Sequence, residues 1–202
     1  MYRLANWFEK RFLLDPERTL AHSLAEIMDS LKEQLEKARF ERALEVAESL
    51  AAHRALLTTA ELGRLNQILT GKNTDPWRQG SVTLKLPSGK VETLAVIADP
   101  KQIARERLHR ATEIAEAGSA IDAALDMYAG LVMSHVFQDA NRRTAALASH
   151  YFFRRYGVPI SGVELHDLSL GDLRQEGQLE ALREAVRQMA LFAEKRIKDS
   201  KK

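Results

Sequence analysis

The spacing of apolar residues is helical over most of this 202-residue chain and becomes strand-like in one short stretch. Residues 82–86 alternate apolar and polar side chains, Pro-Ser-Gly follows at 87–89, and Val91, Thr93, Ala95 and Ile97 then occupy every second position. Two period-2 runs around a Pro/Gly turn predict a β-hairpin over residues 81–97. An isolated hairpin is marginally stable, so it must lie on a helical body. We therefore predict a mainly α fold that carries one β-hairpin.

The rest of the chain is rich in Ala, Leu, Glu and Arg, which favour helices. Residues 17–53 contain neither Gly nor Pro and predict two helices. A further helix is predicted over residues 59–71, where it ends at a glycine. Asp-Pro at 99–100 is typical of an N-cap followed by proline at the first helical position, and it predicts a helix to about residue 117. A buried helix then extends to Met133.

Composition excludes several functional classes. The chain has 30 basic and 28 acidic residues, a formal net charge of +2, which argues against a dedicated nucleic-acid binder, so we expect no nucleic-acid partner. It has no cysteine, so disulfides and thiolate metal sites are impossible. No run approaches about 20 apolar residues, and charges stand in the first ten residues where a secretory signal needs an apolar run. We expect no membrane association and a cytoplasmic location, or delivery into another cell's cytosol.

The most informative stretch is residues 134–146, which read Ser-His-Val-Phe-Gln-Asp-Ala-Asn-Arg-Arg-Thr-Ala-Ala. An apolar helix is predicted before it and another after it, over residues 147–156, closed by Gly157. The stretch is thus a short loop that ends at a helix N-terminus. Such an end is a natural anion site, because its first amides are free and the helix dipole is positive there.

The side chains of this loop suit phosphate chemistry. His135 can take a proton from a hydroxyl near neutral pH. Asp139 is a hard oxygen ligand suited to Mg²⁺ shared with nucleotide phosphates. Asn141 can donate and accept hydrogen bonds, and Arg143 can clamp phosphate oxygens through its planar fork. Phe137 is expected to be a structural anchor that pins the loop to the core.

The basic pair Arg142 and Arg143 has a structural alternative, since it could simply begin a solvated helix. Cations at a helix N-terminus are unfavourable with the helix dipole, so a bound anion explains the pair better. A helical DNA-binding protein could also use such a pair, but the near-neutral charge disfavours that interpretation.

The pattern His-x-Phe-x-Asp-Ala-Asn-Arg-Arg-Thr at residues 135–144 resembles the signature of the Fic/Doc family, His-x-Phe-x-(Asp/Glu)-(Gly/Ala)-Asn-(Gly/Lys)-Arg. The resemblance implies a Fic-type helical bundle with this loop between two central helices. It also implies a hairpin flap that aligns a target segment by strand addition, and residues 81–97 have the matching position. The resemblance covers roughly residues 58–192. We therefore expect an N-terminal helical extension at 1–57 and a Fic-like domain at 58–202.

By this resemblance the protein is a transferase that moves a phosphate-containing group from ATP, or another nucleoside triphosphate, to a Ser, Thr or Tyr hydroxyl of a target protein. His135 would be the general base and Asp139 would hold Mg²⁺. Asn141, Arg142 and Arg143 would bind the nucleotide phosphates.

Apart from Val136 in place of its proline, three positions depart from the commonest, AMP-transferring form of the signature, His-Pro-Phe-x-x-Gly-Asn-Gly-Arg-x-x-Arg. Ala140 and Arg142 replace its glycines, and Ala146 replaces its terminal arginine. Alanine followed by a basic residue resembles the Doc toxins, which are kinases, and this slightly favours phosphoryl transfer. The long flap and the chain length are more similar to AMP-transferring members, so AMP transfer stays open. The missing terminal arginine also leaves open a catalytically inactive interaction module.

Many family members carry an inhibitory helix with the pattern (Ser/Thr)-x-x-x-Glu-(Gly/Asn). Here Glu176-Gly177 is the one Glu followed by Gly or Asn, and the residue four positions before it is Asp172. We therefore expect no built-in inhibitor, and control by a separate antitoxin-like inhibitor protein or by narrow target choice.

Overall fold

The computed structural model describes residues 16–85, 89–167 and 173–200 of the chain. The chain divides into two compact units, Met1–Ala38 and Arg39–Lys202. This division falls earlier than the boundary at residue 57 that the sequence suggests. The prediction of two helices over residues 17–53 was wrong: a single helix, α2 (Pro16–Ala52), spans them. No Gly or Pro interrupts this stretch, so nothing in its sequence ends the helix early.

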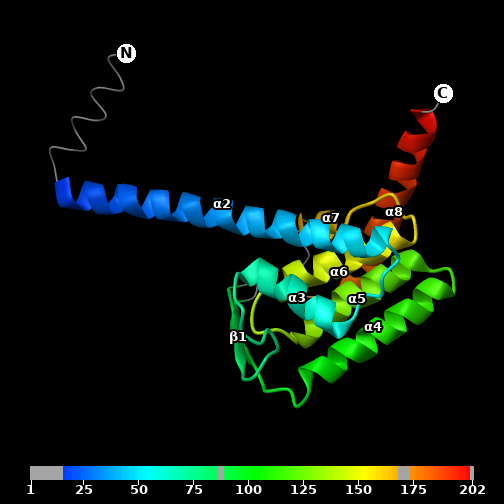
Figure 1. The fold of residues 1–202 in the computed structure, drawn as a ribbon, viewed down its shortest axis with the longest axis horizontal. Coiled ribbons are helices and arrows are strands. Elements are labelled where there is room, and N and C mark those ends of the chain that lie inside the picture. Colours follow the sequence, from blue (N-terminus) through cyan, green and yellow to red (C-terminus); the bar gives the residue numbers. More distant parts are fainter. Residues whose placement is uncertain (1–15, 86–88, 168–172, 201–202) are drawn as a thin grey trace. The chain divides into compact units, whose positions relative to one another are not determined.

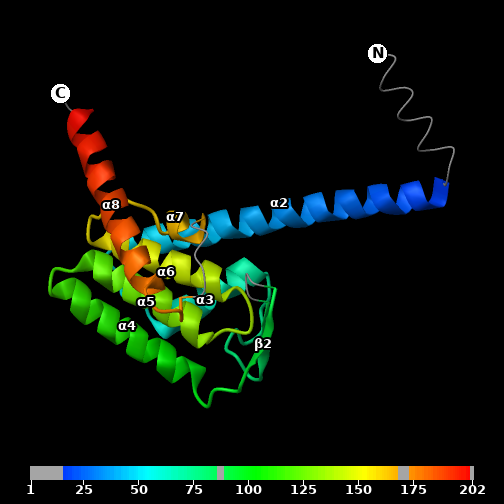
Figure 2. The same cartoon turned by 180° about the vertical axis from the view of Figure 1, so that it is seen from behind.

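Two central helices form the core of the second unit, and four others pack on them (Figures 1 and 2). The central pair is α5 (Ala120–Ser134) and α6 (Asn141–Arg155). Packed on α5 are α4 (Pro100–Glu116) and α8 (Gln178–Asp199); packed on α6 are α3 (Thr59–Thr70) and α7 (Gly162–Asp167).

Helix α6 lies at the centre of the second unit. Every residue from Thr144 to Phe153 is buried, so the helix is enclosed on all sides. In the part of α2 that belongs to the second unit, Ala43, Ala47 and Ala51 are buried and spaced four residues apart. They lie on one face of the helix, where their small side chains join the hydrophobic core.

The predicted hairpin is confirmed. Strands β1 (Val82–Lys85) and β2 (Val91–Leu94) pair antiparallel, with Val82 opposite Leu94. They are shorter than the predicted span, and part of the predicted turn, residues 86–88, lies outside the described residues. In the described part of the chain, seven helices and this two-stranded sheet make the fold mainly α, as predicted.

The helix ends also follow the sequence. Thr58 caps α3 by accepting a hydrogen bond from the Glu61 amide at 3.2 Å, and Gly71 ends this helix with a φ of 67°. Asp99 caps α4, and Pro100 is its first residue. Among the described helices, we find none long and apolar enough to cross a membrane.

Candidate active site

The loop between α5 and α6 begins and ends with a residue in the left-handed region. His135 has a φ of 47° and Ala140 a φ of 54°. Left-handed backbone costs a residue with a Cβ about 1–2 kcal/mol. Two residues within a stretch of six adopt this unfavourable backbone. They allow α5 to end at His135 and α6 to begin directly after Ala140.

Replacing Ala140 with glycine should therefore raise the free energy of unfolding, by up to about 1 kcal/mol, because glycine adopts this backbone without strain. The matched control is Ala145→Gly in the interior of α6, which should lose at least about 1 kcal/mol. Urea unfolding of the two variants makes the comparison. Equal losses in both variants would contradict a strained Ala140.

A short β-bridge holds the outer side of this loop. Trp77 pairs with Phe137 in antiparallel fashion, and two backbone hydrogen bonds of 2.9 and 3.0 Å join residues 76–78 to residues 136–138. The two rings stack with centroids 4.7 Å apart. Phe137, the expected anchor, has no exposed surface, and Trp77 is also buried. The bridge therefore ties the loop to the segment that leads into the hairpin.

Asn141 closes the loop from inside. Its Oδ1 accepts the Phe137 amide and its Nδ2 donates to the Phe137 carbonyl, both at 2.8 Å, and the side chain is buried. One face of the carboxamide is thus committed to shaping the loop. Its contact with phosphate stays a prediction, and one Nδ2 hydrogen is left for it.

Asn66 is a site residue that the sequence analysis missed. It lies on α3, is 1% exposed, and its Nδ2 donates to the Asp139 carbonyl at 2.8 Å and to Thr144 Oγ1 at 3.0 Å. Thr144 Oγ1 in turn donates to the Ala140 carbonyl at 2.9 Å. The signal was present, since Asn66 is an amide among leucines on the buried face of an amphipathic helix.

Arg78 is a second missed residue, and it joins the hairpin to the loop. It is 3% exposed, and its Nε donates to the Gly80 carbonyl at 2.9 Å. Its Nη1 donates to the His135 carbonyl at 3.2 Å and its Nη2 to the Leu94 carbonyl at 3.3 Å. One guanidinium thus contacts the carbonyl before β1, the carbonyl that ends β2 and the carbonyl of the loop histidine, so the open end of the hairpin lies close to His135. No local pattern marks Arg78, because arginine in a turn-rich segment is ordinarily solvated.

A second contact holds the hairpin on its β2 side. Arg174, from the segment that precedes α8, makes a two-pronged ion pair with Glu92 at 2.7 and 2.8 Å. Both side chains are about one-third exposed, so the pair contributes modestly to stability. Its geometry fixes the hairpin relative to the C-terminal part of the unit.

His135 lies in an environment that favours the neutral imidazole. Burial is the main cause that lowers the pKa of His135, and the positive charges of Arg78 and Arg174 lower it further. The Val132 carbonyl opposes this effect. Nδ1 is buried and makes no hydrogen bond of good geometry with any described residue, which leaves Nε2 as the atom for proton transfer.

Asp139 fits a magnesium ion that arrives with phosphate. Its side chain is exposed, and Oδ1 accepts the Ala140 amide. Among the described residues, no group of three or more histidines and acids converges to hold a metal by protein ligands alone. Mg²⁺ in nucleotide sites commonly takes one or two carboxylates together with phosphate oxygens, and a single Asp139 matches that arrangement.

No side chain among the described residues caps the N-terminus of α6. Ala140 occupies the N-cap and offers no side chain to bond the first amides. Arg142 is exposed, and its Nε donates to the buried Tyr128 hydroxyl at 3.1 Å. Arg143 is half-buried beside it. The structure therefore brings His135, Asp139 and both arginines onto one loop and the first turn of one helix.

Comparison with known proteins agrees with this arrangement. The chain resembles the crystal structure of a Fic-domain-containing signaling protein from Bacteroides thetaiotaomicron, with a TM-score of 0.60 and 18% identity over 81% of this chain and 72% of that one. It also resembles Fic-1 from C. elegans, with a TM-score of 0.56 and 20% identity over 83% of this chain and half of that chain's length. No curated protein sequence matches it. The model of the Fic/DOC family matches residues 43–153, more than half of the sequence, and the chain therefore belongs to the Fic/DOC family.

Proposed function

We propose that this protein transfers a phosphate-containing group from a nucleoside triphosphate to a hydroxyl of a target protein, with phosphoryl transfer favoured. Proteins of its family generally transfer nucleotide-derived groups to proteins. One observation carries the proposal: a half-buried histidine with a lowered pKa lies between an uncapped helix N-terminus and a hairpin. A base, an anion site and a peptide-docking edge are the three parts that such a reaction needs.

In the proposed mechanism a target segment pairs with an outer edge of the hairpin and presents its hydroxyl to His135. His135 Nε2 accepts the hydroxyl proton as the oxygen attacks phosphorus, and the remainder of the nucleotide leaves. Arg142, Arg143 and the first amides of α6 hold the phosphate oxygens. Mg²⁺ at Asp139 would neutralise charge on the phosphates. Arg78 positions His135 and the hairpin relative to each other.

The preference for phosphoryl transfer over AMP transfer rests on the departures from the AMP-transferring signature at Ala140, Arg142 and Ala146. Arg142 stands where AMP-transferring members have glycine, and its side chain contacts Tyr128. Ala146 stands where they have arginine, and it is fully buried. An added Cβ at Gly162 of α7 would lie 2.1 Å from the Ala146 carbonyl oxygen, so α6 and α7 are in close contact there. Position 146 is alanine and therefore supplies no guanidinium to a phosphate in this chain.

A substitution at Arg142 tests which group, phosphate or AMP, is transferred. In wild type the mass added to a target residue should be one phosphate. Arg142→Gly should reduce phosphate addition and allow weak AMP addition, because backbone amides could then approach the phosphates directly. Arg142→Lys, which keeps the charge, should still add phosphate. If wild type already adds AMP, the preference for phosphoryl transfer is wrong, while the transferase proposal stands.

The pH dependence follows from His135. A general base must be neutral, and the pKa of His135 is lowered below its usual value of 6.5. As pH falls, activity should therefore persist below pH 6.5 and decline only once the imidazole binds a proton. A profile of kcat/KM against pH measures this limb. A half-maximal point above pH 6.5 would contradict the assigned environment.

Regulation by a separate antitoxin-like inhibitor remains a prediction. It rests on the resemblance and on the absence of an inhibitory pattern in the sequence.

A further inference from the structure

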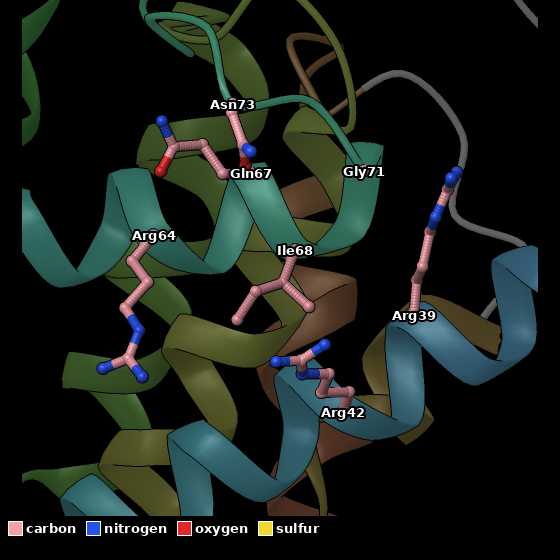
Figure 3. Close-up of a pocket in the computed structure, with 7 residues that line it drawn as sticks. All are labelled: Arg39, Arg42, Arg64, Gln67, Ile68, Gly71 and Asn73. Atoms are coloured by element: carbon pink, nitrogen blue, oxygen red, sulfur yellow. The ribbon is translucent and has the colours of Figure 1, made fainter.

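A pocket with a volume of about 330 Å³ lies away from the catalytic loop, between α3 and the part of α2 that belongs to the second unit (Figure 3). Three arginines line it, together with two side-chain amides and one isoleucine: Arg39, Arg42, Arg64, Gln67, Asn73 and Ile68. No carboxylate is among the lining residues. The lining therefore offers hydrogen-bond donors and positive charge, which is the chemistry of an anion site.

The charges in this pocket are poorly compensated. Among the described residues, no acidic side chain pairs with Arg42. Arg64 faces Glu61 one helical turn away at 3.6 Å, and because the Arg64 side chain is 60% exposed, solvent screens the pair and keeps its energetic value small. Arg39 donates to the Thr70 carbonyl at 3.3 Å. Three guanidinium groups thus line one pocket in a chain whose net charge is only +2, and a bound anion would relieve their repulsion.

The arrangement suits more than one phosphate group. Figure 3 shows the Arg42 side chain from α2 next to Ile68, Arg64 from α3 further along the same helix, and Arg39 extending beside the end of α3 at Gly71. Guanidinium forks on two helices can each hold the oxygens of a separate anionic group. The volume lies at the lower end of the range for small-molecule sites and exceeds the space of a single ion. We infer that this pocket binds a small phosphorylated molecule with at least two anionic groups.

The pocket and the catalytic loop lie on opposite faces of α3. Asn66 donates to the Asp139 carbonyl on the loop side. Arg64 and Ile68 are two positions before and after Asn66, which is about 200° around a helix. A ligand in the pocket would therefore bind independently of the catalytic phosphates, and this inference does not require the proposed transferase activity.

Calorimetry with inorganic pyrophosphate as the probe tests the inference. The experiment uses the full chain in an Arg143→Gln background, which weakens phosphate binding at the catalytic loop. Pyrophosphate should still bind, and adding Arg42→Gln with Arg64→Gln should weaken it by about tenfold or more, since two charge-assisted contacts are lost. Arg105→Gln, at an exposed arginine of α4, is the matched control and should leave binding unchanged.

Arg42 and Arg64 are exposed, so the double variant should fold, which helical circular dichroism and the unfolding midpoint verify. Hydrogen exchange should show protection by pyrophosphate over residues 39–42 and 64–73. Absence of binding at millimolar pyrophosphate would overturn the inference. So would affinity that is unchanged by the pocket substitutions.

Discussion

Replacing His135 with alanine should slow group transfer by about 100- to 10,000-fold, the usual cost of losing a general base. The imidazole is half-buried, and its pKa is lowered by burial and by two neighbouring arginines, so it is neutral and ready to accept a proton at physiological pH. The proposed phosphate contacts come from other residues, so nucleotide binding should change little. The measurement is the rate of target modification, with nucleotide affinity determined in parallel.

His109→Ala provides the matched control for this substitution. His109 is exposed on α4 and faces Glu113 one turn away, far in sequence from the catalytic loop. Its loss should leave the transfer rate unchanged. If the transfer rate of His135→Ala stays within a few-fold of the wild-type rate, the assignment of His135 as the general base is wrong.

Replacing Arg78 with methionine should produce the second largest effect, on both stability and activity. The guanidinium satisfies carbonyls of Gly80, His135 and Leu94 in a buried position, and methionine leaves all three without this donor. Each such loss is costly, so the free energy of unfolding should fall by roughly 3 kcal/mol. The hairpin would also lose its link to His135, so kcat/KM for a protein target should fall by about tenfold or more.

A purely structural role for Arg78 can be separated from a positioning role by the pH profile. The charge of Arg78 lowers the pKa of His135, so its removal should raise that pKa and move the acid limb of kcat/KM to higher pH. Arg78→Lys, which keeps the charge, should leave the limb close to its wild-type position and restore part of the activity. If Arg78→Met loses stability but keeps both kcat/KM and the acid limb, Arg78 is only structural.

Local sequence signals predicted the elements that depend on local physics. Thr58 and Gly71 bound α3 because a hydroxyl caps an N-terminus and glycine accepts left-handed backbone. Alternating residues around a Pro/Gly turn predicted the hairpin, and its pairing of Val82 with Leu94 is observed. The loop at His135 was also predictable, because its residue types and its place between two apolar helices are both visible in the chain.

Long-range contacts were not predictable in the same way. Arg78 contacts His135 across 57 positions, and Asn66 contacts Asp139 across 73. Only the folded arrangement brings these residues together. The continuity of α2 was missed although its signal is local, since residues 17–53 contain no Gly or Pro that would end the helix. The signature also does not determine whether phosphate or AMP is transferred, because Arg142 and Ala146 depart from the commonest form at positions that shape the phosphate site.

The most direct test of the central claim uses ATP labelled on either the α- or the γ-phosphate, incubated with the protein and a lysate. We predict that label reaches protein from the γ position, that it does not from the α position, and that His135→Ala abolishes this transfer. Label from the α position would show that AMP is transferred, and the proposal of phosphoryl transfer would then be wrong. No labelled protein from either position, with wild type indistinguishable from His135→Ala, would contradict the transferase account.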